Sequence, residues 1–338
     1  MSLPVDVQLM APPTEVVDRA RALAATGVAG LFTFEGPNDV FIPLVLAAGV
    51  APVDLMTNVA IAFPRSPVHL AHAAWDLQAL SGGRFRLGLG SQVRAHVERR
   101  YGATWSHPAA RMREVVLAVK AVLSAWEGEA PLDFRGRFTT HTLMTPAFDP
   151  GPNPFGPPPV LLGALGPRMT EVAAEVADGL LVMPFNSRRH LEERTVPAID
   201  RGLATAGRKR GDLEVVGEVI VATGRTEEEQ QAAVDGVRWL LAFYASTPAY
   251  RPVLEVEGWA ELQPELNALS KQGEWSAMAT RVDDAMVEAI AVRGTPEQCA
   301  EQIARRFDGV ADRVCCYFPG YDIPDERITE LVAALAKT

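Results

Sequence analysis

The chain has 338 residues, 48% hydrophobic and 22% charged, which is the composition of a globular protein with a substantial core. Its 32 basic and 42 acidic residues give a net charge of −10, which disfavours binding to nucleic acid. No apolar run approaches the ~20 residues that span a membrane. The start, MSLPVDVQLMAPP, lacks the basic and long apolar regions of a signal peptide. We therefore expect a cytoplasmic protein with no nucleic-acid or membrane partner.

Strand and helix patterns alternate from the first residues onward. Apolar runs predict eight strands, at 4–10, 29–36, 53–63, 84–90, 159–165, 178–185, 212–223 and 311–319. Helical spacing with glycine or proline at the ends predicts helices at 13–27, 39–48, 66–83, 107–128, 166–177, 187–207, 226–245, 295–307 and 325–338. The chain therefore reads as repeated strand–helix units.

Two segments depart from this repeat. Residues 129–158 end in a run rich in proline and glycine, TPAFDPGPNPFGPPP, which is incompatible with regular structure and is either a linker or an excursion between two units. Residues 246–292 form a helical or irregular insertion. Both segments would build the substrate pocket, so the sequence does not identify the substrate.

Eight strand–helix units in one chain predict a (β/α)8 TIM barrel, a single domain over 1–338 with these two insertions. A doubly wound sheet is the alternative. It usually carries a glycine fingerprint after its first strand, and VQLMAPPTEV has none.

The stretch LSGGRFRLGLGSQ contains four glycines around the fourth strand. Phe85, Leu87 and Leu89 share one face of that strand, whereas Arg86, Gly88 and Gly90 share the other. The second face loses its side chains towards the C-terminal end, where a TIM barrel carries its active site. Either Gly88 and Gly90 leave a slot for a planar ligand, or they permit a bulge or tight barrel packing.

A second glycine-containing turn follows the fifth strand. Gly163, Ala164, Leu165 and Gly166 precede Pro167, which suits the first turn of a helix. The turn is either an anion site at a helix N-terminus or an ordinary strand–helix connection. Met183, after the sixth strand, borders a ligand or the barrel rim.

The runs TNVAIAFPRSPVHLAHAAWDLQALSGGRFRLGLGSQ and RMREVVLAVKAVLSAWEG resemble the luciferase-like monooxygenase superfamily, in particular its branch that uses the deazaflavin coenzyme F420. ALGPRMTEVAAEVADGLLV and VRGTPEQCAEQIARRF also match, so the resemblance covers nearly the whole chain. It implies a TIM barrel that binds a flavin-like ring at the C-terminal ends of its strands.

The resemblance also implies roles for particular residues. A non-proline cis peptide in the third strand, behind the central ring, falls on Asn58–Val59. Gly90, Ser91 and Gln92, together with the turn 163–167, match the parts that hold the ribityl chain and phosphate. The ends of the first two strands would face the substrate.

At the end of the second strand, F420-using relatives often carry an acidic residue followed by a histidine that transfers a proton. This chain has Glu35-Gly36, so the histidine is missing. Glu35 is either a general acid or base with a pKa raised by burial, or a cofactor-binding residue. Asp39 is expected to cap a helix.

SQVRAHVERRYG is a basic stretch in an acidic chain. Arg94, Arg99 and Arg100 either attract the anionic tail of the deazaflavin or form a solvated helix face. His96, in the same stretch, is the histidine to test first as a catalytic residue.

Other catalytic patterns are absent. His69 and His72 have helical spacing without an acidic ligand, and no serine lies in a G-x-S-x-G elbow. The three cysteines, Cys299, Cys315 and Cys316, include an adjacent pair and no CxxC, so we expect reduced thiols and no metal.

The sequence thus leaves three functions open. The first is an F420-dependent oxidoreductase that transfers a hydride to or from a small organic substrate. The second is a two-component monooxygenase that uses FMN supplied by a partner reductase. The third is a flavin- or deazaflavin-binding protein without catalytic activity. Because many relatives are dimers, we expect a homodimer.

Overall fold

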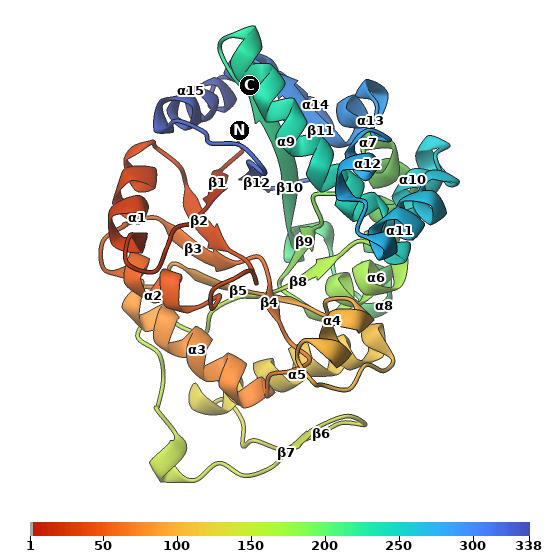
Figure 1. Cartoon of the computed structure of the whole chain (residues 1–338). Helices are drawn as coiled ribbons and strands as arrows, with labels where there is room; N and C mark the ends of the chain where they lie inside the picture. The colour runs from red at the N-terminus through yellow and green to blue at the C-terminus, as the bar shows by residue number, and fades with distance from the viewer. Residues whose placement is uncertain (1–2) are drawn as a thin grey trace.

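The computed structural model describes residues 3–338 and contains a closed barrel of eight parallel strands (Figure 1). Around the barrel these are β1 (Val5–Gln8), β2 (Gly30–Thr33), β3 (Asp54–Thr57), β5 (Phe85–Gly90), β8 (Val160–Ala164), β9 (Gly179–Val182), β10 (Glu214–Thr223) and β12 (Arg313–Tyr317). β12 pairs with β1 in parallel and closes the ring. The predicted (β/α)8 barrel is confirmed.

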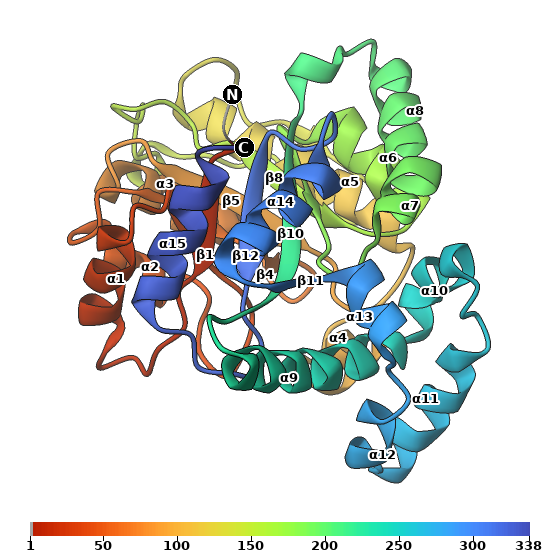
Figure 2. The same cartoon turned by 90° about the horizontal axis from the view of Figure 1, so that it is seen from above.

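Helices cover the outside of the barrel, as the view from above shows (Figure 2). They are α1 (Val16–Ala25), α2 (Ile42–Ala48), α3 (Pro67–Leu80), α5 (Pro108–Trp126), α6 (Pro167–Val176), α7 (Arg188–His190), α8 (Val196–Ala206), α9 (Glu227–Ala245), α14 (Pro296–Phe307) and α15 (Asp325–Leu335). Local chemistry fixes their starts. Ser66 caps α3 just before Pro67, and Thr295 and Gln298 form a capping box at α14. Asp39 accepts hydrogen bonds from the amides of Phe41 and Ile42 just before α2, whereas the N-cap of that helix is Phe41 and not Asp39 as expected.

The first insertion is an excursion between consecutive barrel strands, since β5 pairs directly with β8. It contains the hairpin β6 (Phe134–Arg135) and β7 (Thr140–His141), which projects from the barrel (Figure 1). The proline-rich run after it has no regular structure apart from the single 3₁₀ turn Pro146–Phe148, where proline suits the first position.

The second insertion is mostly helical. It comprises the 3₁₀ turn Pro248–Tyr250, α10 (Arg251–Glu257), α11 (Leu262–Gln272), α12 (Trp275–Ala279) and α13 (Asp284–Ile290). α11 and α12 pack on α9 at one side of the barrel (Figure 2). A short strand that the sequence did not predict, β11 (Ala291–Gly294), follows and pairs with the C-terminal half of β10. The predicted helix 187–207 is confirmed as a continuous helical run from Arg188 to Ala206, which contains one π-helical turn at Leu191–Thr195.

The barrel interior is layered. Its N-terminal floor is an ion-pair network of Asp6, Asp54, Arg86, Glu214 and Arg313. Above it lies an apolar layer of Phe32, Met56, Leu161, Leu181, Val216 and Cys315. Residues two positions further along several of these strands, such as Glu218 and Tyr317, form the polar and aromatic upper layer. The two lower layers fill the barrel, so its interior is accessible only from the C-terminal mouth.

In the described part of the chain, residues 3–338, no helix combines the length and apolar character needed to cross a membrane. Within the same residues, no three His, Cys, Asp or Glu side chains are grouped to hold a metal ion. Cys299, Cys315 and Cys316 are buried free thiols.

Candidate functional site

The third strand is interrupted at the barrel mouth. β3 ends at Thr57, the peptide bond between Asn58 and Val59 is cis, and the two-residue strand β4 (Ala60–Ile61) resumes pairing with β5. Thr57 fixes the interruption to β5: its hydroxyl donates to Gly88 O (2.8 Å) and accepts from Gly88 N (2.9 Å). The cis bond lies at the position that the family resemblance implies.

Gly88 and Gly90 do not leave an open slot in the barrel wall. A Cβ at Gly88 would lie 1.9 Å from Thr57 O and 2.6 Å from Leu181 Cδ1, and one at Gly90 would lie 2.3 Å from Val59 Cγ2. The expectation of an empty slot is therefore wrong, and the packing alternative describes the site. The two glycines let residues 57–59 press against β5, so the wall presented to the mouth is the bulge itself.

Asn58 and Glu218 meet across the barrel. β3 and β10 are four strands apart in either direction around the eight-stranded ring, so they face each other across its axis. The Asn58 side chain lies near enough to the Glu218 carboxyl to lower its pKa. Both residues are 8% exposed. A buried carboxyl therefore lies near the barrel axis, beside the bulge.

Burial dominates the chemistry of Glu218. Loss of hydration raises its pKa to about 8, and the neighbouring Asn58 offsets that rise only in part. Glu218 in turn contributes to raised pKa values at Tyr317 of β12, Tyr250 and Tyr244. The carboxyl is therefore mostly protonated at neutral pH and is bordered by phenol side chains.

Three amides near the mouth have a buried atom with no hydrogen-bond partner: Asn58 Nδ2, Asn186 Oδ1 and Gln8 Oε1. Asn186, after β9, is held in place by donating to Met183 O and, at 3.5 Å, to Glu218 O. Buried polar atoms are normally paired, so each of these three atoms offers a hydrogen-bonding position to a ligand.

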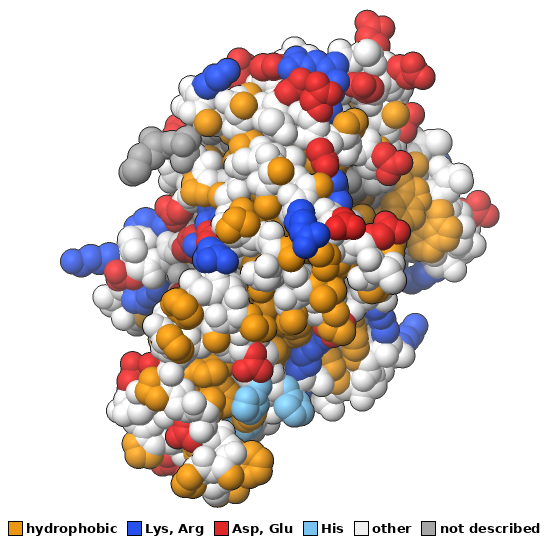
Figure 3. Space-filling model, turned by 90° about the vertical axis from the view of Figure 1, so that its left-hand side faces the viewer, with side chains coloured by type: hydrophobic (Ala, Val, Ile, Leu, Met, Phe, Trp, Pro, Cys, Tyr) orange, Lys and Arg blue, Asp and Glu red, His pale blue; other side chains and the backbone are white. Residues whose placement is uncertain are grey.

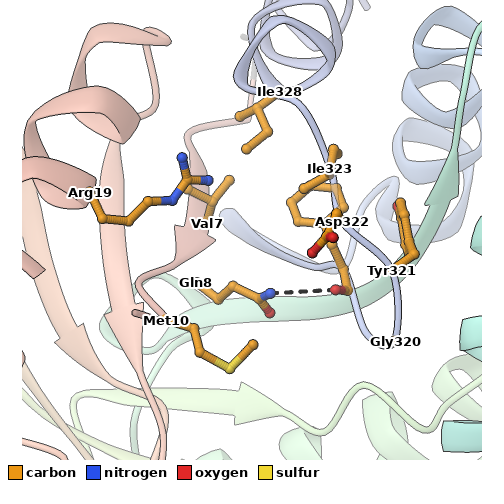
Figure 4. Close-up of a pocket in the computed structure, with 10 residues that line it drawn as sticks. Val7, Gln8, Met10, Arg19, Gly320, Tyr321, Asp322, Ile323 and Ile328 are labelled. Carbon is orange, nitrogen blue, oxygen red and sulfur yellow. Dashed lines mark hydrogen bonds between the residues drawn. The ribbon is translucent and has the colours of Figure 1, made fainter. Parts of the chain in front are cut away.

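A cavity of 540 Å³ opens beside β1 and β12 at the same end of the barrel (Figure 4). Gln8, Met10, Phe318 and Tyr321 line it, and Gln8 Nε2 donates to Phe318 O at 3.5 Å. Glu218 is not among its lining residues. The cavity adjoins the end of the first strand, where the family resemblance places the substrate.

Glu35 is held in a cluster of fixed contacts. Its Oε1 accepts from Ile61 N (3.2 Å) and pairs with Arg65, while its Oε2 accepts from Tyr101 OH (3.3 Å). Arg100, which precedes Tyr101 in the chain, donates to Gly36 O at 2.9 Å. Glu35 thus ties the loop after β2 to β4 and to the segment after β5. This geometry shows an anchoring role, and its catalytic role remains a prediction.

The segment after β5 surrounds one side of the mouth. Gln92 has a positive φ of 59°, and its Oε1 accepts from Val93 N, while Ser91 Oγ donates to Gln92 O. The short helix α4 (Arg94–Arg99) follows, with His96 half-buried and both Arg94 and Arg99 exposed. Arg94 pairs with Glu98 on the same helix. No contact brings His96 to Glu218 or Asn58, and its catalytic role is still a prediction.

The turn after β8 also reaches the mouth. Gly163 lies against the bulge, since a Cβ there would be 3.0 Å from Val59 Cγ1. Gly166 is the N-cap of α6, Pro167 its first residue, and the Ala164 carbonyl accepts from Met183 N. Of the predicted cofactor-binding residues, the structure therefore brings Val59, Gly90 and Gly163 into one cluster.

Sequence reasoning did not single out Glu218. The signal was present: VVGEVIV, at 215–221, carries one carboxylate in an otherwise apolar strand. A buried strand accepts such a residue only where it has a specific role or partner.

Most of the chain matches a known family. Residues 2–313 match the family model described as "Luciferase-like monooxygenase". The chain is 49% identical over 302 residues to uncharacterized protein Rv1360 of Mycobacterium tuberculosis, covering 89% of each chain. It is 31% identical to a 5,10-methylenetetrahydromethanopterin reductase of Archaeoglobus fulgidus, covering 77% of this chain and 75% of the relative. A putative coenzyme F420-dependent oxidoreductase, Rv3520c of M. tuberculosis, is 29% identical and covers 87% of each chain.

Solved structures share the fold. The coenzyme F420-dependent tetrahydromethanopterin reductase of Methanopyrus kandleri superposes with a TM-score of 0.81 at 21% identity, covering 99% of this chain and 98% of that one. The oxygenating constituent of 3,6-diketocamphane monooxygenase from Pseudomonas putida, in complex with FMN, gives 0.66 at 14% identity and covers 99% of each chain. The chain belongs to the luciferase-like monooxygenase family, whose named relatives are oxidoreductases and monooxygenases.

Proposed function

We propose that this protein is an oxidoreductase that binds the deazaflavin F420 at the barrel mouth and transfers a hydride between it and a small organic substrate. The observation that carries the proposal is that buried amide atoms without a hydrogen-bond partner occur at the C-terminal ends of three barrel strands: Gln8 Oε1 in β1, Asn58 Nδ2 after β3 and Asn186 Oδ1 after β9. The relatives named for F420 favour this cofactor.

The residues present fit such a ring. Its pyrimidinedione edge offers carbonyl acceptors and N–H donors, which complement one amide donor and two amide acceptors. Val59, backed by Gly90 and Gly163, would support one face of the ring. Ser91, Gln92 and the turn 163–167 would hold the ribityl chain and phosphate, the latter at the N-terminus of α6.

When bound, the cofactor supplies or accepts the hydride. The protein's own residues determine where this happens. Thr57, hydrogen-bonded to both backbone groups of Gly88, fixes the bulge, and Glu35 with Arg65 holds the adjoining segment in register. The apolar layer beneath excludes water from below.

The alternative is an FMN-dependent monooxygenase with a partner reductase, because one structural neighbour is a monooxygenase in complex with FMN. Titration of the purified protein with F420 and with FMN, followed by fluorescence of each ring, tests the choice. We expect saturable binding of F420 and weaker binding of FMN. Tighter FMN binding, with oxygen consumption when reduced FMN is supplied, would favour the monooxygenase. F420 binding without turnover of any substrate would favour a non-catalytic binding protein.

We further propose a homodimer that pairs through the face carrying α2. Ile42, Val45 and Leu46 of α2 are 57%, 45% and 38% exposed. Figure 3, which views this side of the molecule, shows hydrophobic side chains running through the middle of the face. Exposed apolar groups clustered on one face are typical of protein–protein contacts.

A further inference from the structure

We propose that Glu218 is the acid–base residue of this site, and that its substrate is an uncharged organic compound with a polarised C=O or C=N bond, or the corresponding alcohol or amine in the reverse direction. This inference rests on the proposed function. It assigns the proton transfer to a residue on the seventh barrel strand and narrows the substrate class.

The position of Glu218 supports this role. It lies one layer above the apolar residues Val216 and Leu181, on the strand opposite Asn58. Asn58, the first residue of the bulge, lies on the opposite strand and is equally buried, which places the carboxyl across the barrel axis from the proposed support of the ring. A group near the barrel axis beside the bulge is within reach of a substrate lying on that ring. Glu35, a further carboxylate at this end, is already engaged by Arg65 and Tyr101.

The surroundings of Glu218 determine the substrate class. The ionisable groups that face it are Cys315 and Tyr317 of β12, Tyr244 of α9 and Tyr250 at the start of the second insertion. Phe34 packs edge-on against Tyr317 with ring centroids 5.7 Å apart. Within residues 3–338, no lysine or arginine forms an ion pair with Glu218. An anionic reacting group would therefore find no positive partner here, whereas an uncharged carbonyl or imine fits an aromatic compartment with one neutral acid.

In the reductive direction, one hydride and one proton reach the substrate. The substrate carbon takes a hydride, and its two electrons, from the reduced deazaflavin, while the π bond of C=O or C=N breaks. The Glu218 O–H bond breaks and its proton joins the substrate oxygen or nitrogen, which gives an alcohol or an amine. The cofactor leaves oxidised, and Glu218, now a carboxylate, is reprotonated from water at the mouth.

The first test needs neither cofactor nor substrate. In protein labelled with ¹³C at glutamate carboxyl carbons, the spectrum of wild type minus that of Glu218→Gln reports the Glu218 carboxyl alone. We expect one resonance that titrates near pH 8, the value set by burial. A resonance that titrates in the ordinary glutamate range, near ~4.3, would overturn the assignment of a neutral acid at physiological pH.

The second test measures turnover with reduced F420 and a panel of uncharged aldehydes, ketones and cyclic imines, alongside keto acids. We expect turnover of an uncharged member, with kcat/KM for reduction falling above pH 8 in wild type. Glu218→Gln should lower kcat by ~100- to 10,000-fold, without loss of F420 affinity. Glu228→Gln, on the exposed first turn of α9, is the matched control and should behave as wild type.

The outcomes separate the two proposals. Failure of wild type to bind F420 removes the proposed function itself. Binding of F420 with turnover unaffected in Glu218→Gln, or with turnover of keto acids only, overturns the present inference and leaves the proposed function standing. Binding of F420 without turnover of any panel member overturns the substrate class, and turnover of a substrate outside the panel by the same protein would leave the proposed function standing.

Discussion

Arg313 and Asp6 form a two-point ion pair inside the floor of the barrel, with Nε to Oδ2 and Nη2 to Oδ1 both at 2.7 Å. Arg313 also reaches Asp54 at 2.8 Å, and its side chain is 5% exposed. Burial raises the pKa of Asp6, while the guanidinium opposes that rise. Each of these buried charges is therefore stabilised by its partner, and removal of one partner leaves the other without its main counter-charge.

Removal of one partner should strongly destabilise the protein. Asp6→Ala leaves a buried guanidinium short of its main counter-charge, so we expect a loss of ~3–5 kcal/mol in the free energy of unfolding, measured by denaturant titration. Asp18→Ala, at an exposed carboxylate on α1, is the control and should change stability by less than ~0.5 kcal/mol. A small effect of Asp6→Ala would show that the network does not contribute as described.

The close packing of Gly90 against Val59 predicts that a larger residue at position 90 destabilises the protein and that a smaller residue at position 59 restores its stability. A methyl group at position 90 would lie 2.3 Å from Val59 Cγ2 but 3.2 Å from Val59 Cβ. Gly90→Ala should therefore destabilise the protein by ~1–3 kcal/mol and weaken F420 binding, and Val59→Ala in the same chain should recover most of the stability. Gly211→Ala, where nothing lies within 4 Å, is the control. Equal stability of Gly90→Ala and wild type would contradict the packing described.

Glu218 predicts a specific pH dependence of stability. Burial raises its pKa in the folded protein to about 8, above the ordinary value of 4.5. The folded state therefore keeps a proton that the unfolded state releases, and wild type loses stability as the pH rises from 4.5 to 8. Glu218→Gln lacks this loss. Its stability relative to wild type should increase by up to ~1.4 kcal/mol per pH unit across that window and then level off. A difference independent of pH would contradict a neutral buried acid.

The exposed face of α2 predicts the oligomeric state. Val45→Glu would place a charge among Ile42 and Leu46, so sedimentation equilibrium should show a dimer for wild type and a monomer for the variant. Ala204→Glu, at an exposed position on α8, should remain dimeric. A monomeric wild type, or a dimeric Val45→Glu, would exclude this face as the contact.

The barrel architecture was predictable because the alternation of strands and helices depends on local hydrophobic patterns, and these patterns are clear in the sequence. β11 escaped prediction because AVRG is too short to show alternation and is a strand only through its pairing with β10. The prediction that Gly88 and Gly90 share one face of β5 was correct, but the prediction that they leave an open slot was wrong. Whether a glycine leaves space or admits a neighbour depends on Thr57, Leu181 and Val59, which come from other strands. Glu218 was missed for the same reason, since its position opposite Asn58 is set by the closure of the barrel and not by local sequence.

The sealed floor and the apolar layer above it leave Glu218 a single route to bulk water. A ligand that fills the mouth closes that route, so Glu218 exchanges no proton with bulk water while the ligand is bound, and the proton that it transfers is the one it held at binding. The protonation state of Glu218 available for the reaction is therefore fixed when the ligand binds. We expect pH to affect the binding step and not the steps within the closed complex.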